Sequence, residues 1–193
     1  MAWYSLKRTF FDLRALEEPV PPEAALLLQG ADVPAYRQAM RRIGGELDRA
    51  RRYRRALAIT IFGYDNSHDP SVVDDVGLAG GAEAIPGEHA LFPVILAALL
   101  REVTRETDIV TCAGAQARSI VVMPETGVAE AGQAVNRLRE LCAARLKVPI
   151  RAGLAVFPQH GLTLEELLRY AGEDARRCVR DASLIPSIQS LTA

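Results

Sequence analysis

Residues 101–126 read REVTRETDIVTCAGAQARSIVVMPET, and this stretch decides the fold. A charged segment leads into a short apolar run at 109–112, which is followed by a glycine-containing turn at 113–116 and a second apolar run at 119–123 that Pro124 closes. Short β-branched runs separated by a glycine turn are typical of a β-hairpin. The stretch therefore predicts a hairpin that is entered from the end of a helix.

Helix and strand patterns alternate on both sides of this hairpin. Upstream, a strand is expected at 56–64 and a helix from about Pro93 to Arg105; downstream, a helix is expected at 126–146 and a strand at 150–157. Thr163 and Glu166 have the spacing of a capping box, which predicts the start of a last helix. This order predicts an α/β (α+β) fold with a ferredoxin-like βαββαβ core.

Ahead of the core, the sequence predicts an N-terminal helical arm and a helix from about 32 to 55 with Asp32 as its N-cap. The helix carries an apolar stripe, Tyr36, Met40, Ile43, Leu47 and Ala50. Such a stripe suits either a coiled seam with a partner or packing on the domain. We expect an arm and helix start at 1–45, a domain at 46–183 and a tail at 184–193, with a loop at 66–88.

Composition restricts the function classes. The chain has 193 residues, 49% of them hydrophobic, and a net charge of −1, which favours a soluble globular protein over a general nucleic-acid binder. The longest apolar run, 90–100, is too short for a bilayer, which takes about 20 residues. The N-terminus lacks the apolar core of a signal peptide. Cys112, Cys142 and Cys178 show no metal-ligand spacing, so we expect reduced core cysteines in a cytoplasmic protein without membrane insertion.

The hairpin and the strand before it resemble those of GGDEF domains, the family of diguanylate cyclases. In place of the five-letter family motif, the hairpin tip reads Gly114, Ala115, Gln116, Ala117 and Arg118. The resemblance implies that Gln116 replaces the carboxylate that binds two Mg²⁺ ions in the family. The D-x-D of the family's first strand falls on Gly63 and Asp65, so only the second acid is present.

The resemblance thus implies a degenerate GGDEF domain that is not an enzyme, with no catalytic residues, no metal site and no cofactor. An active cyclase that uses Asp65 as a displaced metal ligand is a third interpretation. The dipolar amide of Gln116 is a weaker Mg²⁺ ligand than a carboxylate, which favours the inactive interpretation.

A second motif lies before the hairpin, where Arg105 and Asp108 form an R-x-x-D sequence. It resembles the inhibitory site of the family, which binds the product cyclic di-GMP, and the resemblance adds Arg137 from the following helix. The planar fork of Arg pairs with guanine O6 and N7, and a carboxylate accepts from the opposite guanine edge. We therefore expect a cyclic di-GMP receptor. The alternative is a nucleotide-free interaction module, in which Arg105 and Asp108 form a structural pair and residues 1–55 bind a protein partner or a second copy.

Overall fold

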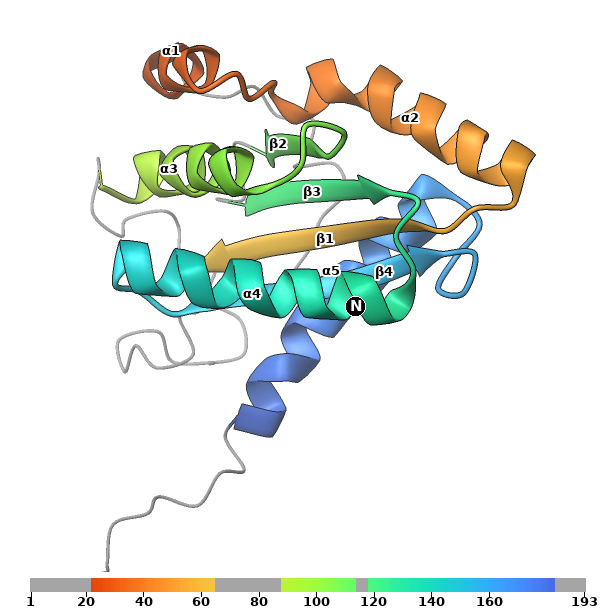
Figure 1. Ribbon diagram of the computed structural model, residues 1–193. Coiled ribbons are helices and arrows are strands. Elements are labelled where there is room, and N and C mark those ends of the chain that lie inside the picture. Colours follow the sequence, from red (N-terminus) through yellow and green to blue (C-terminus); the bar gives the residue numbers. More distant parts are fainter. Residues whose placement is uncertain (1–21, 65–87, 114–117, 183–193) are drawn as a thin grey trace, which may run out of the picture.

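The computed structural model describes residues 22–64, 88–113 and 118–182 (Figure 1). Its strands are β1 (Leu57–Tyr64), β2 (Ile109–Ala113), β3 (Arg118–Pro124) and β4 (Ile150–Phe157). Its helices are α1 (Pro22–Gly30), α2 (Tyr36–Tyr53), α3 (Glu88–Val103), α4 (Val128–Leu146) and α5 (Leu164–Ala182). The strands form one antiparallel sheet in the order β2-β3-β1-β4, which confirms the predicted βαββαβ core with one further helix.

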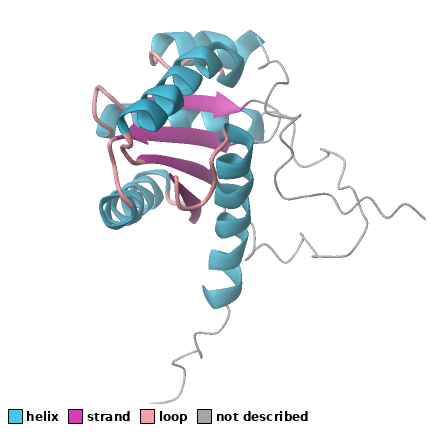
Figure 2. Ribbon diagram, turned by 90° about the vertical axis from the view of Figure 1, so that its right-hand side faces the viewer, coloured by secondary structure: helices cyan, strands magenta, loops and turns pink. Residues whose placement is uncertain are grey.

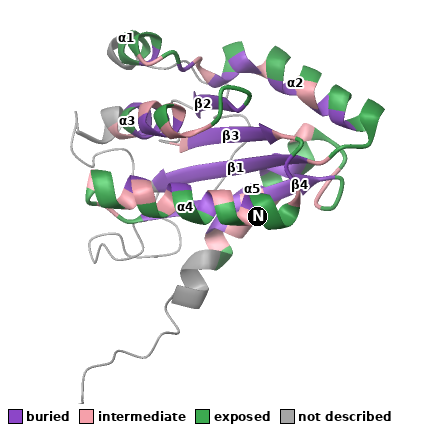
Figure 3. Cartoon of the chain, viewed as in Figure 1, coloured by how far each residue is buried: buried purple, intermediate pink, exposed green. Residues whose placement is uncertain are grey.

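Helices cover both faces of the sheet, as Figure 2 shows. Successive strand residues point to opposite faces, so Ala58 and Phe62 of β1 belong to the core under α3 and α4. Leu57, Ile59 and Ile61 belong to a second core, under α2 and α5. Because both faces are covered, β3 and β4 are buried almost throughout, whereas the helices expose their outer sides (Figure 3).

The stripe of α2 packs on the domain itself. Tyr36, Ile43, Leu47 and Ala50 are buried and share a core with β1, β3 and α5. Of the two alternatives for this stripe, packing on the domain is therefore the one observed. The helix also runs without a break through residues 45 and 46, where the sequence suggested a boundary between arm and domain.

The expected N-cap at Asp32 is wrong. The helix begins at Tyr36 after Ala35, without a side-chain cap, and Asp32 has a φ of 53°. Its backbone N–H donates to the carbonyl of Gln29 at 3.2 Å, and that of Val33 donates to the carbonyl of Leu28 at 2.9 Å. The short polar side chain of Asp tolerates this left-handed conformation, so Asp32 ends α1 instead of starting α2.

The expected start of α3 is also wrong, because the helix begins at Glu88, ahead of Pro93. Proline inside a helix removes the backbone N–H that would donate to the carbonyl four residues earlier. The carbonyl of Pro93 accepts a hydrogen bond from the hydroxyl of buried Ser119 on β3 at 3.2 Å. This contact fixes α3 against the hairpin.

The start of α5 confirms the capping box. The Thr163 hydroxyl accepts a hydrogen bond from the backbone N–H of Glu166 at 3.2 Å, and the Glu166 carboxylate accepts from the backbone N–H groups of Leu162 and Thr163 at 2.7 and 3.1 Å. These hydrogen bonds lower the pKa of Glu166, and the one from the Leu162 N–H has the largest effect. The box therefore fixes where the chain turns from β4 into α5.

The arm also packs on the domain, since Leu28 and Val33 are buried in the core that α3 and α4 cover.

Burial raises the pKa of Cys112 to about 12 and that of Cys142 to about 11, as expected for unreactive core thiols. In the part of the chain that the structure describes, no helix combines the length and apolar character needed to cross a membrane. The side chain of Cys178, the tail at 184–193 and the loop at 66–88, apart from Glu88, lie outside the described residues.

Candidate functional site

The R-x-x-D sequence forms the turn between α3 and β2. The Asp108 carboxylate accepts a hydrogen bond from the backbone N–H of Arg105 at 3.0 Å, and the Asp108 N–H donates to the Arg105 carbonyl at 3.1 Å. Asp108 is buried, with 6% of its surface exposed, whereas the Arg105 side chain is exposed. Asp108 therefore shapes the turn that presents Arg105, and the two residues are linked through the backbone and not as a side-chain ion pair.

Arg101 supports the same turn, and sequence reasoning missed it. Its Nη1 donates to the carbonyls of Arg105 and Asp108 at 3.2 and 3.4 Å. A signal was present, because Arg101 lies one helical turn before Arg105. The pKa of Asp108 is raised, mainly by burial, although the hydrogen bond from Arg105 and the charges of Arg105 and Arg101 act in the opposite direction.

The three residues expected to bind cyclic di-GMP lie around one shallow hollow between this turn and α4. Arg105, Asp108 and Arg137 line it, together with Glu130 and Thr104. Its volume is about 50 Å³, well below the roughly 300 Å³ at which enclosed ligand pockets begin. The hollow is therefore too small to enclose a nucleotide, and the side chains of Arg105 and Arg137 at its edge are exposed.

Glu130 is the second residue that sequence reasoning missed at this site. It lies two turns before Arg137 on α4, so both project from the same side of the helix. A carboxylate there can accept hydrogen bonds from a guanine N1–H and N2–H edge. The hollow thus combines two guanidinium groups with an exposed carboxylate.

The opposite end of β2 leads to the hairpin tip, where the resemblance places the metal ligands of the family. The register pairs Gly63 of β1 with Arg118 of β3 on one side and with Arg151 of β4 on the other. Directly paired residues point to the same face, which is the one that α5 covers. Burial, together with the charges of Arg151 and Arg176, lowers the pKa of Arg118 to about 10, so three guanidinium groups lie close together.

These residues do not fit a magnesium site. Mg²⁺ takes oxygen ligands, above all carboxylates, whereas Gly63 offers no side chain and its two strand neighbours carry positive charge. Within the described ranges, no three His, Cys, Asp or Glu side chains gather as metal ligands would. Asp65 and the tip residues Gly114, Ala115, Gln116 and Ala117 lie outside those ranges, so their expected roles stay predictions.

The buried carboxylate leads to a prediction on stability. Because burial raises the pKa of Asp108 above its ordinary value of 3.8, ionisation costs more in the folded than in the unfolded state. The free energy of unfolding of the wild type is therefore expected to fall as the pH rises from below 3.8 through the raised pKa. Asp108→Asn lacks this titrating group, so the difference between the two proteins changes over the same range. Urea unfolding of both proteins between about pH 3 and 6 measures this difference, and a constant difference would contradict it.

No family model matches the sequence, and no curated protein matches it. Solved structures do match. A DGC protein from Thermotoga maritima superposes with a TM-score of 0.56 at 12% identity, over 74% of this chain and 95% of that one. The GGDEF domain of TpbB (YfiN) from Pseudomonas aeruginosa has a TM-score of 0.54 at 21% identity, over 77% and 86%. The FimX GGDEF domain, also from Pseudomonas aeruginosa, has a TM-score of 0.53 at 15% identity, over 75% and 87%.

The described chain is thus a domain with the GGDEF fold. At these identities the likeness extends to the fold, and the site must be judged on its own residues. Two places matter: the end of the sheet where arginines flank Gly63, and the turn at Arg105 and Asp108.

Proposed function

We propose that this protein is a catalytically inactive GGDEF-like domain that acts in cyclic di-GMP signalling as a receptor. The observation that carries the proposal is the convergence of Arg105, Asp108 and Arg137 on one hollow, at the end of β2 away from the hairpin tip. With about 3.4 Å per residue, the five-residue strand β2 is roughly 17 Å long, and the hollow lies at its Ile109 end. Binding at the hollow is therefore independent of the residues that have been lost at the tip.

The roles of the residues follow from their exposure. Arg105 and Arg137 are exposed, so their planar guanidinium groups can pair with guanine O6 and N7. Glu130 is exposed as well and can accept from a guanine Watson–Crick edge. The Asp108 carboxylate accepts a hydrogen bond from the Arg105 N–H, so its role is to stabilise the turn.

A calorimetric titration with cyclic di-GMP tests the proposal. The wild type is expected to bind, and Arg105→Ala and Arg137→Ala are each expected to weaken binding about tenfold or more, because each loses a bidentate contact of about 1–3 kcal/mol. Arg105→Lys is expected to weaken it too, since an ammonium group cannot form the planar fork. Asp108→Asn is expected to have a smaller effect, because the Asn side-chain oxygen can still accept from the Arg105 N–H.

Arg139→Ala is the matched control. Arg139 lies on α4 two residues after Arg137, about 200° around the helix, and does not line the hollow. If the wild type does not bind, or if Arg105→Ala binds equally well, the receptor role is wrong. The interaction module would then become the leading interpretation, with residues 1–55 as its contact region apart from the stripe of α2, which is buried in the domain.

A further inference from the structure

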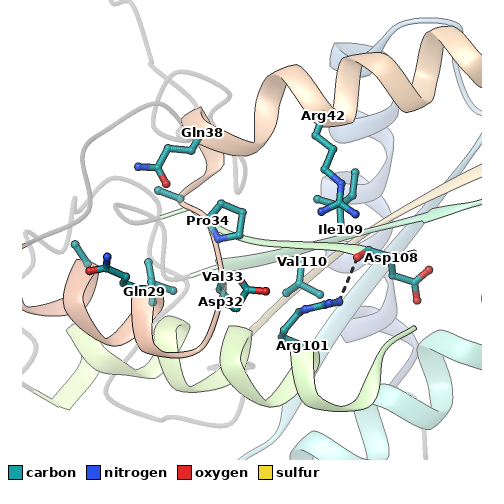
Figure 4. A pocket seen from close by; sticks show the side chains of 13 residues that line it. Gln29, Asp32, Val33, Pro34, Gln38, Arg42, Arg101, Asp108, Ile109 and Val110 are labelled. Carbon is teal, nitrogen blue, oxygen red and sulfur yellow. Dashed lines mark hydrogen bonds between the residues drawn. The ribbon is translucent and has the colours of Figure 1, made fainter. Parts of the chain in front are cut away.

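A larger cavity lies where the arm crosses the edge of the sheet. Its volume is about 560 Å³, within the roughly 300–1,000 Å³ of small-molecule sites. Figure 4 shows that its walls come from α1, the 31–35 connection, α2, the end of α3 and the start of β2. The cavity is separate from the hollow at Arg105, because Asp108 is the one residue that lines both. The Asp108 carboxylate is already engaged, since it accepts a hydrogen bond from the Arg105 N–H.

The wall formed by the arm is held in place by the domain. Ala35 forms a parallel bridge with Cys112 of β2, and the Thr111 hydroxyl donates to the Pro34 carbonyl at 2.8 Å. On the other side of the connection, Leu28 and Val33 are buried in the core. The cavity is therefore preformed, which reduces the ordering cost of binding a ligand.

The lining combines apolar residues with polar and charged ones, among them two arginines. Ala25, Pro34 and Ala35 contribute accessible apolar surface, whereas Leu28, Val33 and Val110 lie behind it and are almost fully buried. Figure 4 shows Arg42 reaching from α2 and Arg101 from α3 toward the start of β2. Two acidic residues, Asp32 and Asp108, also line the cavity.

The two guanidinium groups keep their charge available. Arg101 donates to two neutral carbonyls, and Arg42 forms no ion pair with any described residue. On the same helix, by contrast, Arg49 pairs with Glu46 at 3.3 Å. Arg42 and Arg101 both line the cavity without forming an ion pair with a described carboxylate, so a carboxylate or a phosphate group bound there can accept charged hydrogen bonds from them.

We propose that this cavity binds a small organic anion. Its carboxylate or phosphate accepts hydrogen bonds from Arg42 and Arg101, and its apolar part lies against Ala25, Pro34 and Ala35. This site is distinct from the proposed cyclic di-GMP site, so either proposal can fail without the other.

Two probes with the same body and different charge test the site. Anilinonaphthalenesulfonate is an anion whose fluorescence rises in apolar surroundings, and N-phenylnaphthylamine is its uncharged analogue. We expect one molecule of the anion to bind per chain, and the neutral analogue to bind at least about tenfold more weakly, because charged hydrogen bonds are the strong ones. Displacement by naphthoate and by naphthyl phosphate then distinguishes a carboxylate from a phosphate ligand.

Arg42→Gln is expected to weaken binding of the anionic probe about tenfold. Arg42 is exposed, so this change leaves the core intact, whereas Arg101 also holds the turn at Arg105. Arg41→Gln is the control, because Arg41 is the exposed neighbour that does not line the cavity. Absence of probe binding, equal binding of the two probes, or equal weakening by the two variants would each overturn the proposal.

Discussion

Incubated with labelled GTP and Mg²⁺, the purified protein is expected to form no cyclic di-GMP above a protein-free blank. Two-metal phosphoryl transfer needs carboxylates that hold both ions beside the reacting phosphates. At the end of β1 the chain instead presents Gly63, which has no side chain, between Arg118 and Arg151, whose guanidinium groups cannot bind a metal cation. Typical enzymes accelerate their reactions about a millionfold or more. For the formation of cyclic di-GMP from GTP, this acceleration is therefore expected to be absent.

A diguanylate cyclase of known activity, assayed in parallel, shows that the assay detects product. Labelled GTP also separates newly formed cyclic di-GMP from any nucleotide that copurifies with the protein. Product that appears with the wild type and disappears with Asp65→Ala would contradict the expectation. It would show that Asp65 acts as a displaced metal ligand and that the chain is an active cyclase.

Gly153→Ala is expected to destabilise the fold by about 3 kcal/mol or more. A Cβ at Gly153 would lie 2.0 Å from the Ala171 carbonyl oxygen and 2.3 Å from the Ala175 backbone nitrogen. Both are backbone atoms of α5, so the whole helix must move away from β4 to relieve the clash. That movement would open the core in which Leu167 and Leu168 are buried.

Gly132→Ala is the matched control for that substitution. Gly132 lies within α4, and an added Cβ there meets no atom within 4 Å. Alanine favours a helix over glycine by up to about 1 kcal/mol, so this variant is expected to be slightly more stable than the wild type. Urea unfolding of the three proteins measures both effects. A Gly153→Ala protein as stable as the wild type would show that α5 does not pack tightly on β4.

The type and order of the helices and strands of the core could be predicted from the sequence alone. The apolar run at 150–157 is β4 with the expected limits, and Thr163 and Glu166 form the expected capping box. The stripe at Ile43 and Leu47 is the buried face of α2. These features are readable because a helical or strand period, or a cap, involves residues a few positions apart. The same local signals failed at Asp32, which follows α1 and does not cap α2, and at Pro93, which lies inside α3 and not at its start.

The composition of the sites depends on contacts between residues that are distant in the sequence. The register of three strands places Arg118 and Arg151 beside Gly63, although Gly63 and Arg151 lie far apart in the chain. The packing of α4 against the α3–β2 turn brings Arg137 and Glu130 to Arg105, and the path of the arm forms the cavity at Arg42 and Arg101. Sequence periodicity reports which face of an element is buried, but not which other element covers it. Strand register and helix docking follow from contacts between distant residues, and those contacts create the charge pattern of each site.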